Sequence, residues 1–287
     1  MKEVIIIGNG PAGISASLYT ARAGIKTTVI GKDGGALMKA DKIENYYGFE
    51  NPISGEYLIN AGMAQSKRLG VEMMNDEVTS IGYEGKLTVK TVNGEYKADS
   101  VILATGANRV VPKIKGIDTY EGKGVSYCAV CDGFFYRGKD VAVLGNGEYA
   151  LSEAMELLPI VKSVTMITNG KELTAKIPEN IHVIAKEIEK FTGTDSFEKI
   201  LFKDGTSLTV SGVFVALGIA GSTDFAKKLG AEISGRNIVV DEKMATNVPG
   251  LYAAGDCTGG MFQIAKAVYE GAKAGTEAVK YLKNIIM

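Results

Sequence analysis

The hydrophobic positions of the chain form a short unbroken run followed by a helical repeat, and this order occurs twice. Residues 4–7 are all Val or Ile, which is typical of a parallel strand buried on both faces. An apolar periodicity over residues 11–23 then predicts a helix. The same order returns at residues 141–144 and 148–158. Two units of one kind in one chain predict an internal structural repeat.

The patterns between and after these units predict the other elements. Four short strand-like runs end at residues 101–103, and the turns at Gly85 and Asn93-Gly94 favour a small antiparallel meander. A buried strand is expected within residues 248–256. The expected helices are residues 55–69 and 261–283, and the expected further strands are residues 27–30, 164–167, 181–184, 199–202 and 213–217. Residues 111–116 are expected to form a linker.

A glycine-rich loop joins the first strand to the first helix. In this loop Gly8 permits a tight turn, Gly10 lets the backbone approach a pyrophosphate, and Gly13 lets the helix pack on the strand. Pro11 suits a first helical position, where its missing N–H costs nothing. The strand before and the helix after favour a nucleotide-binding loop over a plain turn. Residues 145–147 begin a second loop of the same type.

Composition narrows the class of protein. Of the 287 residues, 46% are hydrophobic and 36 are glycine, as expected of an α/β protein with many strand-to-helix turns. The net charge of −1 provides no field that would attract nucleic acid or an anionic membrane. No apolar run approaches the ~20 residues needed to cross a bilayer, and three cysteines argue against a secreted disulfide scaffold. We expect a cytoplasmic protein.

The Cys128-Ala129-Val130-Cys131-Asp132 stretch carries the most chemistry. Two thiols at this spacing can form a disulfide, and Asp132 can exchange a proton with a departing thiolate. A redox-active dithiol is the favoured reading beside βαβ patterns. A zinc site that also uses Cys257 and His182 is an alternative, although only the first two thiols have ligand-pair spacing. A structural disulfide or a chance pair is the other alternative.

Taken together, these motifs resemble the low-molecular-weight thioredoxin reductases over essentially the whole chain. The segment from Cys128 to Tyr136, Cys-Ala-Val-Cys-Asp-Gly-Phe-Phe-Tyr, is the most specific match. The other matching motifs, in order, are the first glycine loop, Gly34-Gly35, Glu44-Asn45, Ala104-Thr105-Gly106, the second glycine loop, Gly255-Asp256 and Gln263.

The resemblance implies an α/β fold of two Rossmann-like three-layer nucleotide-binding domains, the second inserted in the first. Residues 1–112 and 219–287 would form an FAD domain, and residues 113–218 an inserted NAD(P)H-like domain that carries the dithiol. The resemblance also implies a homodimer that binds FAD and reduces thioredoxin. No metal is expected.

The resemblance also assigns roles to residues. Cys131 would face the flavin, Cys128 would attack the disulfide of the protein substrate, and Asp132 would be the acid–base group. The flavin supplies the electron chemistry in such a protein, and the chain supplies placement. The residues expected to bind FAD are Gly8, Gly10, Pro11, Ala12, Gly13, Gly34, Gly35, Leu37, Asn45, Ala104, Thr105, Gly106, Gly255, Asp256, Gln263 and Ile264.

The second domain departs from the family pattern in three ways. No arginine follows its second strand, and Lys171 stands beside Glu172, whereas a 2′-phosphate needs forked or clustered cations. Glu148 falls at the helix N-terminus where a pyrophosphate should rest. Residues 168–181 are short for the helix that typical members carry. The chain therefore looks like the ferredoxin-dependent branch, which lacks the NADPH motifs, and we expect ferredoxin as electron donor. NADPH or NADH is the alternative.

Functions of other classes stay open at this point. An electron-transfer flavoprotein without disulfide chemistry would keep its activity in a Cys128→Ser variant. A non-catalytic zinc or interaction module would be colourless and would bind zinc. The Cys-x-x-Cys motif weighs against the first of these classes. Cys257 is expected to be a buried small side chain, and His182 is expected to lie in a strand without a catalytic role.

Overall fold

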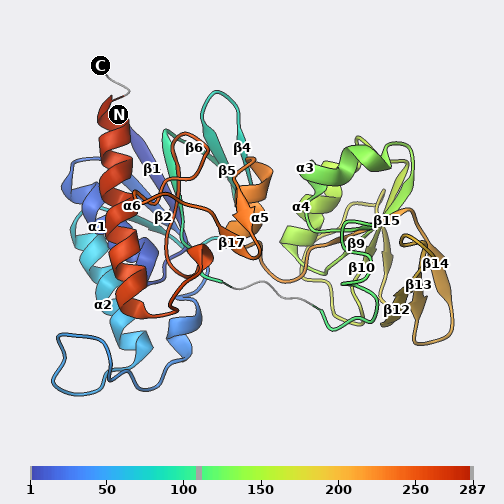
Figure 1. Ribbon diagram of the computed structural model, residues 1–287, viewed down its shortest axis with the longest axis horizontal. Helices are drawn as coiled ribbons and strands as arrows, with labels where there is room; N and C mark the ends of the chain where they lie inside the picture. Colours follow the sequence, from blue (N-terminus) through green and yellow to red (C-terminus); the bar gives the residue numbers. More distant parts are fainter. Residues whose placement is uncertain (1, 108–111, 285–287) are drawn as a thin grey trace. The chain divides into compact units, whose positions relative to one another are not determined.

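The computed structural model describes residues 2–107 and 112–284, and the chain divides into two compact units (Figure 1). The first unit takes in residues 1–108 and 221–287, and the inserted unit takes in residues 109–220. The chain thus leaves the first unit, builds the inserted one, and returns to complete the first.

A five-stranded sheet is the centre of the first unit. Its spatial order is β18-β7-β1-β2-β3, and every neighbouring pair is parallel. The central strand is the Val and Ile run of the sequence, and its residues 4–7 are almost fully buried. The strands are β1 (Glu3–Ile7), β2 (Lys26–Ile30), β3 (Glu72–Met74), β7 (Ser100–Leu103) and β18 (Leu251–Ala253).

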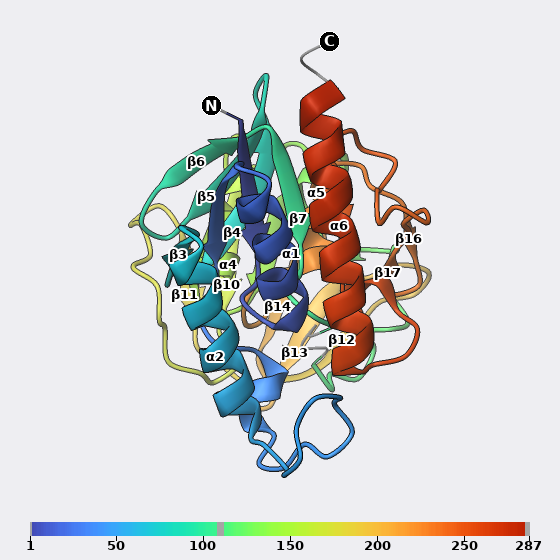
Figure 2. The same cartoon turned by 90° about the vertical axis from the view of Figure 1, so that its left-hand side faces the viewer.

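Helices α1 (Pro11–Arg22), α2 (Gly55–Arg68) and α6 (Ile264–Asn284) lie side by side over this sheet (Figure 2). Two glycines of α6 allow the closest approach. A Cβ at Gly271 would collide with the carbonyl of Ala12, and a Cβ at Gly275 would collide with that of Ala16. Bare backbone at these two positions therefore sets how closely α6 packs on α1.

An antiparallel meander, predicted from the turn at Asn93-Gly94, is confirmed. It consists of β4 (Val78–Tyr83), β5 (Leu87–Thr91) and β6 (Glu95–Ala98), and α5 (Ser222–Lys228) packs against it. The small elements of the first unit are the β16–β17 pair (Ile233–Ser234, Asn237–Ile238) and the 3₁₀ turns η1 (Ala36–Lys39) and η3 (Asp256–Thr258).

The inserted unit repeats the architecture of the first unit. Its parallel sheet has the order β11-β10-β9-β15-β8, and α4 (Glu148–Leu157) follows the central strand β9 as α1 follows β1. A three-stranded antiparallel sheet adds to it. The strands are β8 (Val125–Ser126), β9 (Asp140–Leu144), β10 (Ser163–Ile167), β11 (His182–Ile184), β12 (Ile188–Thr192), β13 (Lys199–Phe202), β14 (Ser207–Thr209) and β15 (Gly212–Val215). Two short turns, α3 (Ala129–Asp132) and η2 (Gly133–Tyr136), complete the unit.

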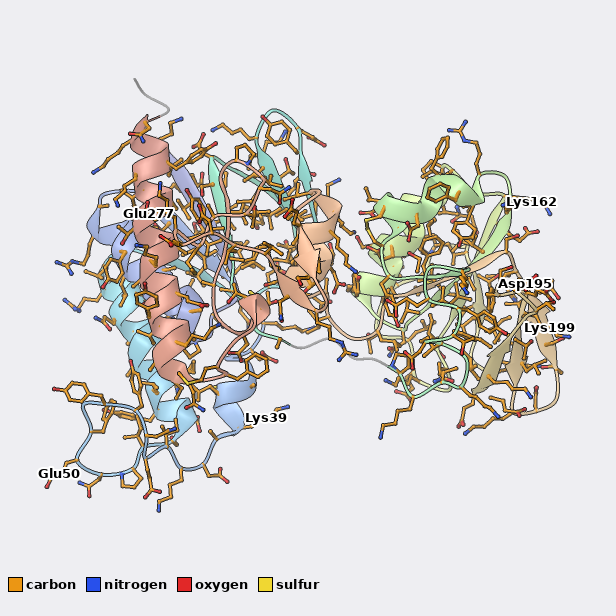
Figure 3. All side chains as sticks on the ribbon, viewed as in Figure 1. Lys39, Glu50, Lys162, Asp195, Lys199 and Glu277 are labelled. Carbon is orange, nitrogen blue, oxygen red and sulfur yellow. A yellow bond between two sulfur atoms is a disulfide. The ribbon has the colours of Figure 1, made fainter. Side chains whose placement is uncertain are left out.

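Each unit has its own hydrophobic core, so the predicted fold class is confirmed: an α/β protein of two Rossmann-like units, one inserted in the other (Figure 3). The expected linker over residues 111–116 is partly wrong. Ile114 is buried in the core of the inserted unit, and Lys115 forms a β-bridge with Lys190. An apolar residue between two lysines gains more from that core than from a solvated tether. Val111 lies outside the described residues.

Candidate active site

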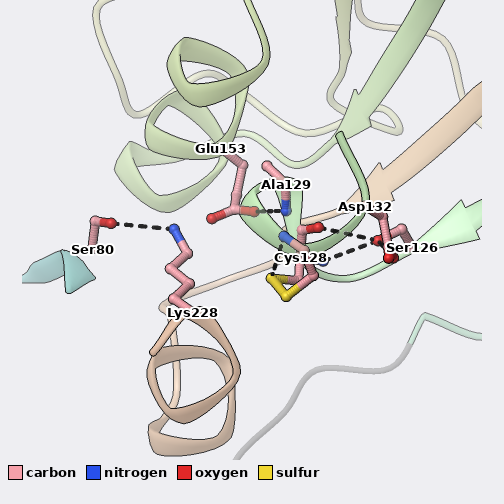
Figure 4. The surroundings of a disulfide bond; sticks show 8 residues. Ser80, Ser126, Cys128, Ala129, Asp132, Glu153 and Lys228 are labelled. Carbon is pink, nitrogen blue, oxygen red and sulfur yellow. Dashed lines mark hydrogen bonds between the residues drawn. A yellow bond between two sulfur atoms is a disulfide. The ribbon is translucent and has the colours of Figure 1, made fainter. Parts of the chain in front are cut away.

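Cys128 and Cys131 form a disulfide at the edge of the inserted unit's sheet, with their Cα atoms 5.3 Å apart (Figure 4). The short strand β8 delivers the chain to this point by pairing with β15. Cys128 has an extended backbone and caps α3, so its Sγ accepts the N–H of Cys131 at 3.2 Å. Cys128 is buried. The edge strand β8, the Cys128 cap and the helical turn α3 together fix the positions of the two cysteines.

Asp132 is held beside the disulfide by a serine that the sequence reading missed. The Ser126 hydroxyl donates to Oδ2 of Asp132 at 2.6 Å and accepts the N–H of Cys128 at 3.1 Å. The serine therefore links the predicted acid–base carboxyl to the backbone of the first cysteine (Figure 4). Burial, and secondarily the charge of Asp132, raises the pKa of the nearby Tyr136 hydroxyl, as expected of a phenol near a carboxylate.

A second carboxylate, Glu153 of α4, was also missed. Its Oε2 accepts the N–H of Ala129, the residue after Cys128, at 2.8 Å. The side chain is 1% exposed. The signal available in the sequence is an acidic residue on the inward face of an amphipathic helix, which is uncommon unless the charge has partners.

Three strands of the first unit are followed by loops that contain glycine, and they bring several of the predicted cofactor residues to one place. Strands β18, β7 and β1 are neighbours and parallel, so the segments that follow them meet at one edge of the sheet. The ladder continues into these loops: the N–H of Ala104 donates to Ile7 at 2.8 Å, and that of Ala254 donates to Leu103 at 2.9 Å. This is the carboxyl edge, where open α/β sheets bind their ligands.

The first glycine loop forms a cradle of bare backbone. Gly8 has φ +113°, and a Cβ there would collide with the carbonyl of Ala104; a Cβ at Gly13 would collide with the carbonyl of Gly8. In contrast, no atom of the described residues lies within 4 Å of the Cβ positions of Gly10, Gly35 and Gly106. Pro11 is the first residue of α1, as predicted, so the free N–H groups of that helix begin beside open backbone. This arrangement fits a pyrophosphate.

Of the other predicted cofactor residues, the structure brings Asn45 and Gln263 into contact. The Asn45 amide donates to Oε1 of Gln263 at 2.9 Å, across 218 positions of sequence. Ile264 is the first residue of α6. Gly34 lies just before the 3₁₀ turn η1 and Leu37 lies within it, and Asp33 stabilises the start of this turn by accepting the N–H of Gly35 at 3.0 Å.

After β7, Thr105 is tied to the start of α5. Its N–H donates to the Ser222 hydroxyl at 3.0 Å, and its own hydroxyl accepts the N–H of Ser222 at 2.7 Å. This reciprocal pair fixes the loop that runs from Ala104 to Gly106 at the edge of the cradle.

The Gly255-Asp256 turn is held by an ion pair on the first turns of α6. Glu270 accepts the N–H of Gly255 at 2.8 Å, while Lys266 donates to the Gly255 carbonyl at 2.9 Å and to Glu270 at 3.0 Å. Thr258 joins the same cluster through its hydroxyl. Burial raises the pKa of Asp256, Lys266 opposes that shift and Glu270 adds to it. The cluster thus fixes the turn that carries Asp256, a residue expected to bind FAD.

The second glycine loop is not open in the same way. The N–H of Thr174 donates to the Asn146 carbonyl at 2.8 Å, and the Asn146 amide donates to the Glu172 carbonyl at 2.8 Å. A Cβ at Gly147 would lie 3.2 Å from the Thr174 hydroxyl oxygen. Residues 172–174 therefore cover the loop. Glu148 is the first residue of α4, and no helix forms in residues 168–181, all of which are described.

The remaining predicted residues behave as small or peripheral groups. Cys257 is 1% exposed and its thiol donates to the Ala254 carbonyl, and burial raises its pKa to about 12. His182 lies exposed in β11. In the described part of the chain, no cluster of three His, Cys, Asp or Glu could hold a metal ion. No helix there is both long and apolar enough to cross a bilayer.

A nucleotide cradle in one Rossmann-like unit and a Cys-x-x-Cys disulfide in the other define a flavin-type disulfide oxidoreductase. The sequence profile of the pyridine nucleotide-disulphide oxidoreductases matches residues 2–271, and the chain belongs to this family. The family binds FAD, which is therefore the cofactor of this chain, and the bare backbone of the first cradle fits it.

The chain is similar to thioredoxin reductases along its whole length. It is 36% identical over 310 residues to the thioredoxin reductase of Peptoclostridium acidaminophilum, covering 98% of this chain and 97% of the relative. The structure of the atypical thioredoxin reductase TRi from Desulfovibrio vulgaris Hildenborough matches with a TM-score of 0.94 and 44% identity over 99% of both chains. A ferredoxin-flavin thioredoxin reductase from Clostridium acetobutylicum matches with a TM-score of 0.71 and 33% identity, covering 99% of this chain and 100% of that one.

Proposed function

We propose that this chain is an FAD-dependent thioredoxin reductase that receives its electrons from reduced ferredoxin. The observation that carries the choice of donor is the covered second loop, in which Thr174 and Glu172 hydrogen-bond to Asn146. The relatives support the choice of substrate, since those described above are thioredoxin reductases.

The dithiol steps are assigned to three residues. The reduced pair attacks the thioredoxin disulfide through the Cys128 thiolate, so that one S–S bond breaks and a mixed disulfide forms. Cys131 then attacks Cys128, releases the thioredoxin thiol and restores the disulfide seen in the structure. Asp132, held by Ser126, supplies or takes up the proton of the leaving sulfur.

The first unit is proposed to hold the cofactor through its backbone cradle. FAD, when bound, can accept electrons one at a time and pass two to a disulfide. The chain binds and orients it with free N–H groups at the start of α1 and with the polar side chains of Asn45, Asp256 and Gln263. The residues proposed to line the site are Gly8, Gly10, Pro11, Ala12, Gly13, Gly34, Gly35, Leu37, Asn45, Ala104, Thr105, Gly106, Gly255, Asp256, Gln263 and Ile264.

The inserted unit lacks what a nicotinamide dinucleotide needs. A pyrophosphate rests on exposed N–H groups at a helix N-terminus, but α4 begins with the Glu148 carboxylate and residues 172–174 cover its loop. A 2′-phosphate needs clustered cations, and residues 168–176 contain Lys171 and Lys176 with Glu172 between them. These features favour a small redox protein as donor over NADPH or NADH.

An anaerobic titration tests the donor. The oxidised protein is mixed with increasing reduced ferredoxin and, separately, with NADPH and NADH, while the flavin absorbance near 450 nm is followed. We expect stoichiometric bleaching with ferredoxin and no fast bleaching with either dinucleotide. Rapid bleaching by NADPH at micromolar concentration would contradict the proposal. Rapid bleaching by NADH alone would also contradict it and would identify NADH as the electron donor.

A further inference from the structure

We infer that Glu153 is a positioning residue that makes the Cys128–Cys131 pair a stronger reductant. It acts through the backbone amide between the two cysteines. The inference rests on the redox role proposed for the pair, but it does not depend on which donor or which substrate protein the enzyme uses.

Glu153 lies on α4, which packs against the turn that carries the cysteines. Its Oε2 accepts the N–H of Ala129 at 2.8 Å, and the residue is 1% exposed (Figure 4). Ala129 directly follows Cys128. The hydrogen bond is therefore made to the peptide group that joins Cys128 to the helical turn α3, and it holds the Glu153 carboxylate next to that peptide group.

The reduced pair is the state that this contact affects most. Reduction adds two electrons and two protons, so that one S–S bond breaks and two S–H bonds form, and loss of one proton leaves a thiolate. Thiolates are stabilised by nearby backbone N–H groups and by positive charge. A dithiol whose thiolate is well stabilised is a weak reductant, because its reduced form is favoured.

Glu153 works against that stabilisation in two ways. It occupies the Ala129 N–H, so this donor is directed at a carboxylate and not at sulfur. With its carboxyl ionised, as the inference requires, Glu153 also places a negative charge beside the amide that follows Cys128. The N–H of Cys131, which bonds to Sγ of Cys128, is left as a local donor to that sulfur. Both effects shift the equilibrium toward the disulfide, and so toward a dithiol that readily reduces other proteins.

Asp132 is also acidic and lies in the same turn, but its contacts differ. Its Oδ2 accepts from the Ser126 hydroxyl, and Ser126 accepts the N–H of Cys128. Asp132 is thus linked, through Ser126, to the amide N–H of Cys128, whereas Glu153 accepts the next amide N–H, that of Ala129. Asp132 is placed for proton transfer, whereas Glu153 is buried against an amide and placed for a constant electrostatic effect.

The test is the dithiol–disulfide equilibrium of the holoprotein with Glu153→Gln. Glutamine keeps the size and a hydrogen-bond acceptor but loses the charge. Wild type, E153Q and the control E148Q, which makes the same change on the same helix, are equilibrated in buffers of reduced and oxidised dithiothreitol. After acid quenching and alkylation under denaturing conditions, mass spectrometry distinguishes one labelled thiol, Cys257 alone, from three.

We expect E153Q to reach half reduction at a three- to tenfold less reducing buffer ratio than wild type. This change corresponds to a potential about 15–30 mV less negative, and E148Q is expected to titrate with wild type. A buried residue with a purely structural role would change the unfolding transition without moving this ratio. E153D, which returns the charge, is expected to move the ratio back toward wild type.

Two results would overturn the inference. One is an E153Q protein that is folded, retains flavin and titrates with wild type. The other is failure to fold of both E153Q and E153M, which would assign the carboxylate to the stability of the unit. If none of the proteins, wild type included, forms the dithiol, the proposed function itself fails, so the two failures can be told apart.

Discussion

Asp132 shows how much a single side chain depends on its neighbours. An aspartate immediately after a Cys-x-x-Cys pair is placed by sequence alone near a reacting sulfur. The structure adds the Ser126 hydroxyl, which bonds to Oδ2 at 2.6 Å and limits where the carboxyl can point. A proton donor that is held in one orientation accelerates a reaction more than one that samples many orientations.

We predict that Asp132→Asn lowers the rate of thioredoxin reduction by about 100-fold, because the amide cannot exchange a proton with the leaving sulfur. The flavin content should not change. The control is Asp140→Asn. Asp140 lies in β9 of the same unit and forms an ion pair with Lys162. Stopped-flow thiol assays measure the rate. A D132N rate within threefold of wild type would remove Asp132 from the mechanism.

The Lys266–Glu270 pair is a second case at this scale, because both side chains reach the Gly255 turn. Lys266→Met leaves the largely buried Glu270 carboxylate without its cation, which costs about 3 kcal/mol in a buried pair. We predict a corresponding loss in the urea unfolding free energy and easier loss of FAD on dialysis.

Lys280→Met is the matched control, since Lys280 pairs with Glu277 on the same helix but is 61% exposed. An exposed pair contributes at most about 1 kcal/mol. Equal losses in K266M and K280M would show that the Gly255 turn does not depend on the Lys266–Glu270 pair.

At the scale of elements, the two strand–loop–helix units differ in what lies over their glycines. Gly10 and Gly147 are both N-caps with extended backbones and without a side-chain cap. Among the described residues, none lies within 4 Å of a Cβ at Gly10, whereas the Thr174 hydroxyl oxygen lies 3.2 Å from a Cβ at Gly147. The same local sequence type therefore leaves open, bare backbone in one unit and forms a packed turn in the other.

This difference predicts opposite results for the same substitution. Gly10→Ala fits the described chain itself but places a methyl group where we propose that the pyrophosphate approaches, so FAD affinity should fall at least tenfold while the protein remains folded. Gly147→Ala should leave both FAD content and ferredoxin-driven turnover within about twofold. Flavin absorbance after gel filtration measures the first, and thiol release measures the second. Loss of turnover in G147A with FAD retained would indicate that the second loop still binds a ligand needed for activity.

Local patterns predicted the elements well because each rests on short-range chemistry. The buried run at residues 4–7, the glycines at the turns and Pro11 at a helix start all depend on neighbours in sequence. The contacts of Glu153 and Ser126 depend on how a helix and a strand pack around the cysteines, which no periodicity encodes. The linker prediction failed at Ile114 for the same reason, since its burial requires a core formed by later residues.

At the scale of the whole molecule, the insertion of one Rossmann-like unit in another gives the chain two nucleotide-type sheets. One keeps an open carboxyl edge, and the other provides the support for a disulfide. The identity of the fold was predictable because both copies carry the same strand–glycine–helix pattern. The departure of the second loop from the family pattern was predictable from Glu148 and the missing helix, but the covering of the loop by residues 172–174 was not.

The resemblance to low-molecular-weight thioredoxin reductases predicts a homodimer. We expect light scattering with gel filtration to give about twice the 30.4 kDa of one chain at micromolar concentration. A mass of one chain under these conditions, with flavin bound and activity present, would contradict the predicted assembly.

The central claim is that electrons pass from ferredoxin to thioredoxin through the two sulfurs of the inserted unit. The most direct measurement is the appearance of thioredoxin thiols under anaerobic conditions, with wild type and Cys128→Ser compared. We predict thiols with reduced ferredoxin and wild type, none with NADPH, and none with Cys128→Ser although its flavin is still bleached. Thioredoxin thiols produced by the Cys128→Ser protein, or by wild type with NADPH alone, would contradict the account.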